Sequence, residues 1–333
     1  MDSIAQISHF LQMTVELGTP ILFGTLGGIL NEKVGHTNLG VEGMMLMGAV
    51  MGFMTGVNTG NPVLAVLGAG LAGALCALVY ALITVTFMGN QVVTGLVLTI
   101  FGTGLSSFLG NLKTSVEVIP GMFLEQPYNQ AVLSESVVKP LANFKLPYLS
   151  EIPLLGKMFF TQSIYVYISI ALAIILFVYF KKTRPGLSVR MIGENPGAAD
   201  ASGINVSLYK YLHICAGGFL CGMGGAYLSL VSTPSWKEGM TAGIGWIAVA
   251  LVIFATWDPM KALFGAYFFG AMRALGPKLQ NVSIPVIGRV NSQFLDMLPY
   301  IMTVIMLVFI TLRKKKEYQA PAALGNSYFR EDR

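Results

Sequence analysis

Nine long runs of apolar residues restrict the fold of this chain more than any other feature. A helix needs about 20 apolar residues to cross the hydrocarbon core of a bilayer, and each run is close to that length. Only helices and closed barrels satisfy their backbone hydrogen bonds in lipid, and these runs lack the alternation of barrel strands. The pattern predicts an all-α, polytopic membrane helical bundle with about nine transmembrane helices. The runs cover residues 10–30, 40–58, 62–88, 91–110, 163–180, 208–231, 241–257, 260–276 and 297–312.

The composition agrees with a protein surrounded by membrane lipid. Only 11% of the 333 residues are charged, against roughly 25% in soluble domains. The net charge of +5 comes from basic residues at the ends of the runs, so it does not indicate binding to nucleic acid. Cys76, Cys215 and Cys221 lie inside apolar runs and are expected to be buried thiols rather than disulfides or metal ligands. The first run lacks the basic flank of a cleavable signal and is expected to be a retained helix.

Basic residues in two connecting segments predict the orientation, because cytoplasmic loops are rich in Lys and Arg. Four crossings separate the two segments, so both are predicted to be cytoplasmic. The N-terminus then lies outside, the C-terminus lies inside, and the long segment 111–162 is extracytoplasmic. We expect one transmembrane domain over 1–318, with a cytoplasmic loop at 181–207, and a cytoplasmic tail at 319–333. The basic residues are Lys181, Lys182, Arg184 and Arg190 in the loop, and Arg313, Lys314, Lys315 and Lys316 after the last run.

Several catalytic patterns do not occur in the sequence. There is no G-x-x-x-x-G-K-[ST] motif to bind ATP. His9, His36 and His213 are scattered, so we expect no metal site, no resident cofactor and no catalytic residues. Proton-coupled carriers need a titratable group near mid-membrane, whereas the carboxylates near the runs fall at predicted helix ends. A transporter with this sequence is therefore expected to take its energy from another polypeptide. Those carboxylates are Glu16, Glu32, Glu42 and Asp258.

The polar stretch Arg190–Lys210 lies between two apolar runs and contains a short helix signal. Asn195 is a suitable N-cap, Pro196 suits the first helical position, and Gly203 suits a left-handed stop. A helix of about seven residues is not stable alone in water, so we expect it to dock on a cytoplasmic protein. The alternative is a loop with an amphipathic turn on the membrane surface. The residues predicted to contact the partner are Arg190, Gly193, Glu194, Asn195, Pro196, Ala198, Ala199, Asp200 and Gly203.

Four stretches carry a resemblance to a known family. RMIGENPGAADASGINV resembles the cytoplasmic coupling loop of ABC-importer permeases of the sugar, nucleoside and branched-chain amino acid group. Gly27–Ala49 resembles that family's N-I-G-x-E-G-M-M-L-x-G-A segment, and Pro234–Pro259 resembles the bacterial nucleoside-type permeases, which are associated with basic membrane lipoproteins. The end, PAALGNSYFREDR, resembles their P-x-x-L-G-x-x-Y-x-R-E-x-R tail.

The resemblance implies a permease subunit of an ATP-driven importer in the bacterial cytoplasmic membrane, translocating nucleosides or related sugars. Its implied partners are an ABC ATPase subunit that binds ATP-Mg, a second permease that is related or identical, and an extracytoplasmic substrate-binding lipoprotein. In that family the short helix of the loop inserts into a groove of the ATPase. The alternatives are a simple-sugar or branched-chain amino acid permease, an ATP-independent secondary transporter using Glu16 or Glu42, and, remotely, a membrane enzyme.

A polar break between the first two runs is the first candidate for a substrate pathway. One interpretation is a solvated cytoplasmic hairpin over 31–43. The other is a broken helix at membrane depth, in which free backbone groups and Asn38 line a water-filled path. Glu42 belongs to the same candidate pathway, and it also suits the first turn of a helix.

Further pathway candidates lie on later runs. Gln91, Thr94, Thr99 and Thr103 form roughly one helix face, suited either to a hydroxyl-rich ligand or to hydrogen bonds between helices. Trp246 is suited either to stack on a nucleobase or to anchor at the lipid interface, and for Trp236 we favour the anchor.

Two other patterns have a structural and a functional interpretation. Asp258-Pro259 marks either a second ATPase contact or a capped turn. The glycines around Gly218 and Gly222 predict close helix packing, with sliding surfaces of a moving transporter as the less favoured interpretation.

Overall fold

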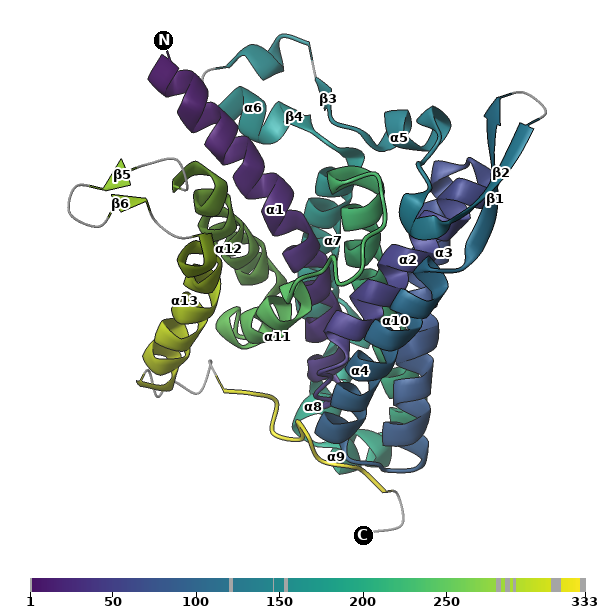
Figure 1. The fold of residues 1–333 in the computed structure, drawn as a ribbon. Coiled ribbons are helices and arrows are strands. Elements are labelled where there is room, and N and C mark those ends of the chain that lie inside the picture. Colours follow the sequence, from purple (N-terminus) through teal and green to yellow (C-terminus); the bar gives the residue numbers. More distant parts are fainter. Residues whose placement is uncertain are drawn as a thin grey trace.

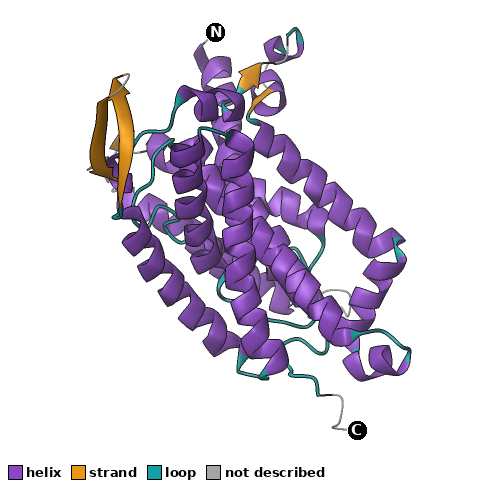
Figure 2. Cartoon of the chain, turned by 90° about the vertical axis from the view of Figure 1, so that its right-hand side faces the viewer, coloured by secondary structure: helices purple, strands orange, loops and turns teal. Residues whose placement is uncertain are grey.

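The computed structural model describes residues 2–119, 122–145, 147–152, 155–279, 283–284, 288–289, 292–312 and 319–329. Helices make up most of it, and the larger β-hairpin projects from the bundle (Figure 2). Each apolar run forms a helix. These helices are α1 (Asp2–Lys33), α2 (Val41–Thr59), α3 (Pro62–Ala81) with a π-helical turn at Leu82–Thr86, α4 (Gln91–Gly110), α7 (Ile164–Lys182), α10 (Val206–Tyr227) with a π-helical turn at Leu228–Ser232, α11 (Ile244–Phe254), α12 (Pro259–Leu279) and α13 (Ser292–Leu312).

Among the described residues, five helical stretches are long and apolar enough to cross a membrane. One departure from the predicted nine is α11, which has 11 residues where the sequence predicts a span over 241–257. At 1.5 Å per residue such a helix is about 16 Å long, too short for a bilayer core of roughly 30 Å. The count of nine spans therefore stays a prediction. The five stretches are Ile4–Lys33, Pro62–Thr86, Gln91–Gly110, Ile164–Lys182 and Val206–Ser232.

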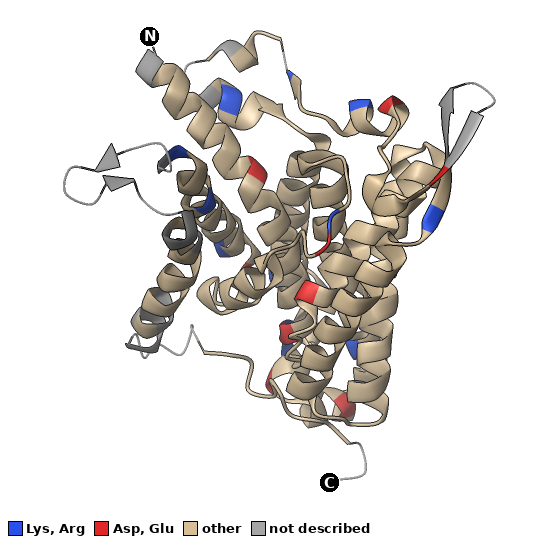
Figure 3. Cartoon of the chain, viewed as in Figure 1, with Lys and Arg blue, Asp and Glu red and all other residues tan. Residues whose placement is uncertain are grey.

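The two chain ends lie at opposite ends of the bundle (Figure 1). The N-terminus shares one end with the 111–162 segment, while α8 (Arg184–Glu194), α9 (Pro196–Ala201) and the C-terminal residues lie at the other. This separation is what the predicted orientation requires, and the assignment of sides remains a prediction. Charged residues are sparse within the described part of the bundle (Figure 3). The basic residues predicted at 313–316 fall outside the described residues.

The chain is not purely helical, because short hairpins accompany the bundle. Within 111–162, alternating Val and polar residues form β1 (Lys113–Ile119), which pairs antiparallel with β2 (Met122–Pro127). The rest of this segment holds 3-10 turns at Tyr128–Gln130 and Leu149–Glu151, α5 (Glu135–Leu141), α6 (Leu155–Phe160), and β3 (Phe144–Lys145) paired with β4 (Thr161–Gln162). A third hairpin, β5 (Ser283–Ile284) with β6 (Gly288–Arg289), precedes α13.

Helices α1 and α10 are central, since 83% and 78% of the residues in their apolar windows are buried, against 28% in those of α4 and α7. Glycines allow α2, α3 and α10 to approach closely. A Cβ at Gly222 would contact the backbone of Ala69, and a Cβ at Gly48 or Gly73 would contact the backbone of Gly222. In lipid, where water does not drive helices together, such close backbone contact provides much of the attraction. The packing interpretation of these glycines is confirmed.

Replacing Gly222 with alanine is expected to lower the thermal unfolding midpoint of the purified protein in detergent, because overpacking costs roughly 1–3 kcal/mol. The matched control is Gly104 in α4, where a Cβ would meet nothing within 4 Å. Gly104→Ala should leave the midpoint unchanged or raise it, since alanine is favoured over glycine within helices by roughly 0.5–1 kcal/mol. Equal midpoints for the two variants would contradict the close packing of α3 and α10.

Candidate functional site

Residues 34–40, which we call the α1–α2 segment, form a buried break between two helices. Val34, His36 and Asn38 are each no more than 2% exposed, and the chain turns at Gly35 with φ of +84°. Glu32 is also buried, where it accepts a hydrogen bond from Trp257 Nε1 at 2.6 Å. The interpretation as a solvated hairpin is therefore wrong, because neighbouring helices cover the segment.

Side chains of α3 and α4 satisfy the backbone of the α1–α2 segment. Tyr80 Oη donates to the Thr37 carbonyl at 2.7 Å, and Thr37 N donates to Gln91 Oε1 at 2.8 Å. Thr99 Oγ1 donates to the Leu39 carbonyl at 2.9 Å. Non-helical backbone buried away from water needs such partners, because an unpaired polar group costs free energy. Two of the predicted pathway residues, Gln91 and Thr99, thus hold this break in place.

The other pathway candidates occupy different surroundings. Asn38 is buried, and its Oδ1 accepts from Gly40 N at 2.8 Å. Thr94 is half-buried and bonds to the Asn90 carbonyl, while Thr103 is exposed, so the predicted stripe does not share one surface. Trp246 is 37% exposed on α11. None of these contacts tests a role in transport, so the pathway stays a prediction.

A buried carboxylate joins α2 to α11. Glu42 is 7% exposed and lies in the first turn of α2. Its Oε1 accepts from Thr241 Oγ1 at 2.6 Å and from Gly243 N at 2.9 Å, and its Oε2 accepts from Gly245 N at 2.6 Å. The carboxyl group therefore lies at the N-termini of two helices, where helix dipoles favour a negative charge. Sequence reasoning missed Thr241, Gly243 and Gly245, although the GMTAGIG stretch before an apolar run is a plausible helix start.

Buried polar groups cluster around the same break. In the part of the chain that the structure describes, the amide of Asn31, both ring nitrogens of His36 and Gln91 Nε2 form no hydrogen bond. Buried polar atoms are usually paired with protein or with ordered water.

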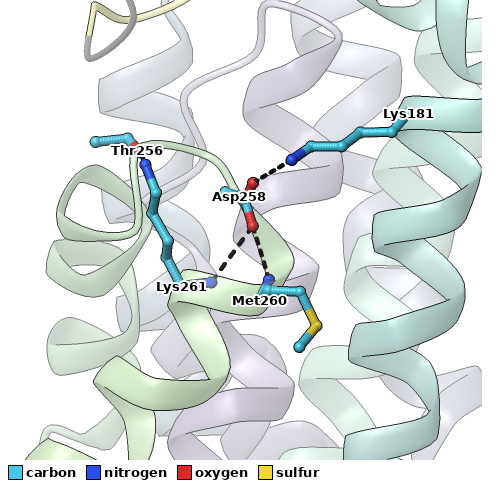
Figure 4. A network of polar contacts seen from close by, with 5 residues as sticks. All are labelled: Lys181, Thr256, Asp258, Met260 and Lys261. Atoms are coloured by element: carbon cyan, nitrogen blue, oxygen red, sulfur yellow. Dashed lines mark hydrogen bonds and ion pairs between the residues drawn. The ribbon is translucent and has the colours of Figure 1, made fainter.

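The turn between α11 and α12 is joined to α7 by an ion pair (Figure 4). Asp258 Oδ1 accepts from Met260 N at 2.9 Å and caps α12, while Oδ2 pairs with Lys181 Nζ of α7 at 3.1 Å. Lys261 Nζ donates to Thr256 Oγ1 at 2.7 Å. Thr256 and Trp257 both have positive φ, 49° and 55°, which non-glycine residues adopt rarely. The interpretation of Asp258 as a capped turn is confirmed, and a contact with an ATPase is not tested.

The 181–207 loop contains two helices. Asn195 Oδ1 accepts from Ala198 N at 3.0 Å, Pro196 occupies the first position of α9, and Gly203 has φ of +82°, as predicted. The preceding helix α8 was missed. Its signal is Thr183, whose Oγ1 accepts from Gly186 N at 3.1 Å, followed by a proline in the first turn.

The predicted partner-contact residues divide by exposure. Gly193 and Ala199 are buried against the bundle, and Pro196 and Asp200 are half-buried. The exposed ones, which a partner can reach, are Arg190, Glu194, Asn195, Ala198 and Gly203.

Trp236 was expected to be an interface anchor. It is instead buried, with 1% of its surface exposed, because Gly110 leaves room for its ring.

Comparison with known proteins identifies the family. The family described as branched-chain amino acid transport system / permease component matches residues 11–310. The chain belongs to this family. The family description is that of a permease component of a transport system, and the several apolar helices agree with a multi-pass membrane protein.

Three relatives match the permease over nearly its whole length. A candidate glucose ABC transporter permease of Haloferax volcanii is 35% identical, covering 96% of this chain and 97% of its own. The nucleoside ABC transporter permease NupC of Lactococcus lactis is 33% identical, covering 94% of each chain. The guanosine ABC transporter permease NupQ of Bacillus subtilis is 31% identical over the full length of both. A second Lactococcus lactis nucleoside permease, NupB, is 21% identical over 82% of this chain.

Removal of the Glu42 carboxylate is expected to destabilise the permease, since two buried donors and one half-buried donor would lose their acceptor. Each buried donor left unpaired costs roughly 1–3 kcal/mol. Glu42→Ala should lower the thermal midpoint in detergent most, and Glu42→Gln, which keeps one acceptor oxygen, should lower it less. Glu135→Ala is the control, because Glu135 is exposed and pairs with the exposed Lys139 within α5, and such surface pairs contribute little. A Glu42→Ala midpoint equal to that of the control would contradict the capping role.

Proposed function

We propose that this permease is the membrane-spanning subunit of an ATP-driven importer of nucleosides in the bacterial cytoplasmic membrane. The observation that carries the proposal is the full-length match to a guanosine permease and to a nucleoside permease. A simple sugar such as glucose is the second candidate, favoured by the 35% identical relative. Both ligand classes contain a hydroxyl-bearing ring, which the polar groups at the helix break are suited to contact.

The proposed assembly contains three further kinds of subunit. An ABC ATPase binds ATP-Mg and supplies the energy, because this chain has no P-loop. A second permease completes the membrane part. Lactococcus lactis has two nucleoside permeases that are 33% and 21% identical to this chain, and their presence in one organism favours a heterodimer with a NupB-type chain. An extracytoplasmic lipoprotein delivers the substrate and provides most of the selectivity.

The proposed orientation places α8 and α9 in the cytoplasm and the N-terminus outside, with nine spans. The ATPase then contacts the exposed side of α9. Lys181 at the end of α7 leads directly into α8, and its ion pair with Asp258 joins this module to the α11–α12 turn. Glu42 holds the other end of α11. A movement of α9 can therefore be transmitted through these contacts to α11 and to the helix break.

We place the substrate pathway beside the α1–α2 segment and α11. Its proposed residues are Asn38, Glu42, Gln91, Thr94, Thr99 and Trp246. The buried polar groups of Asn31 and His36 support this location, since they offer hydrogen bonds at a point where the helix is interrupted.

Reconstitution tests the proposal directly. In proteoliposomes that contain the permease pair, the ATPase and the lipoprotein, we expect uptake of tritiated guanosine only with ATP, and unlabelled nucleosides should compete. Competition by glucose but not by nucleosides would move the assignment to sugars. Uptake by this chain alone, driven by a pH gradient, would contradict an ATP-driven importer.

A large charged side chain on α9 is expected to prevent the ATPase from binding. Ala198 is exposed, so Ala198→Arg should leave the fold intact and remove co-purification of the ATPase. Ala142→Arg is the matched control, because Ala142 is exposed at the opposite end of the bundle. Equal recovery of the ATPase with both variants would show that α9 is not its docking site.

A further inference from the structure

The tail motif P-x-x-L-G-x-x-Y has no role in the proposed function. It lies within residues 319–329, which we call the strap. The strap runs along the end of the bundle where α8 and α9 lie (Figure 1). It follows α13 in the chain, yet its contacts are with elements more than 100 residues earlier.

Two backbone hydrogen bonds fix the strap on the bundle. Ala323 N donates to the Gly193 carbonyl of α8 at 2.9 Å, and Gly325 N donates to the Gly35 carbonyl of the α1–α2 segment at 3.2 Å. Gly325 has φ of +82°, a conformation that favours glycine, and the turn aims its N–H at Gly35. One short stretch of chain therefore bonds both to the last turn of α8 and to the helix break.

A side chain extends the strap to α9. Tyr328 Oη donates to Asp200 Oδ2 at 3.1 Å, and Asp200 lies on α9. The Tyr328 ring is also 5.9 Å from Lys210 Nζ of α10, within reach of a cation–π contact. Tyr328 is thus held between the short helix and the first turns of α10.

The motif residues are the ones that make these contacts. Pro321 is buried beside α8, Leu324 packs against the hydrophobic core, Gly325 forms the bond to Gly35, and Tyr328 reaches Asp200. The intervening Asn326 and Ser327 are exposed. A tail that merely filled space would not need a left-handed glycine and a hydroxyl at these two points.

We propose that the strap, through Gly325 and Tyr328, makes α9 and the α1–α2 segment move as one body during transport. Helix α9 has only six residues and is joined to α8 through Asn195, which has extended backbone, so it can tilt separately from its neighbours. The strap connects it across space to the break held by Tyr80, Gln91 and Thr99. The inference rests on the proposed function, and it names Gly325 and Tyr328 as positioning residues for coupling.

The test uses the complete importer in proteoliposomes and the Tyr328→Phe variant, which keeps the ring and loses the hydrogen bond. We expect the ATPase to bind and hydrolyse ATP as before, while guanosine transported per ATP falls about tenfold, the effect of one hydrogen bond to a charged group. Ser327→Ala is the matched control and should keep the parental ratio. Gly325→Pro, which lacks the N–H and cannot adopt positive φ, should lower the ratio in the same way.

Hydrogen exchange supplies a readout that does not depend on the substrate. On addition of ATP and vanadate, the parent complex should show altered exchange in both 196–201 and 34–40, and Tyr328→Phe should show it in 196–201 only. Parental coupling in both strap variants, or parental exchange in 34–40, would overturn the strap proposal. Loss of ATPase binding in Tyr328→Phe would overturn it too, since the tail would then be a docking surface. An inactive parent complex would instead refute the proposed function.

Discussion

The interruption of helix between α1 and α2 is the constraint on which the rest of the structure depends. Seven consecutive residues lie inside the bundle without regular secondary structure, where water does not satisfy their backbone groups. Tyr80, Gln91 and Thr99 satisfy them from α3 and α4, and the glycines of α2, α3 and α10 bring the helices close enough to do so. A non-helical break of this kind costs free energy in a membrane protein, because its backbone groups lack helical hydrogen bonds. It is tolerated where it lines a cavity or is buried in protein.

The contacts around the break form a continuous set from α9 to the middle of the bundle. The strap links α9 to Gly35, Lys181 links α7 to Asp258, Trp257 links the α11–α12 turn to Glu32, and Glu42 holds the start of α11. The short helix α11 is therefore fixed at both ends by residues of α1 and α2.

The sequence predicted what depends on local composition and missed what depends on distant contacts. Continuous apolar runs identified each large helix, and Asn195, Pro196 and Gly203 defined α9, because caps and turns act within a few residues. The predicted length of α11 was wrong because distant residues set its two limits. Glu42 binds the start of the helix and Glu32 binds Trp257 in the turn after it, and each of these contacts joins residues more than 200 positions apart in the chain. The sequence could not predict whether the α1–α2 segment is buried for the same reason. Its burial depends on hydrogen bonds from Tyr80 and Thr99, which lie far from it along the chain. Helix α8 was missed because no long apolar run marks it.

Accessibility of the helix break during transport tests the central claim most directly. In a variant without the native cysteines, Thr37→Cys keeps the backbone bonds of the α1–α2 segment and places a thiol beside it. With the complete importer in proteoliposomes, we predict that a membrane-impermeant maleimide labels this thiol at rates that differ between the nucleotide-free and the ATP-vanadate states, and that guanosine slows the labelling. A thiol that stays unlabelled in both states would contradict a pathway at this break.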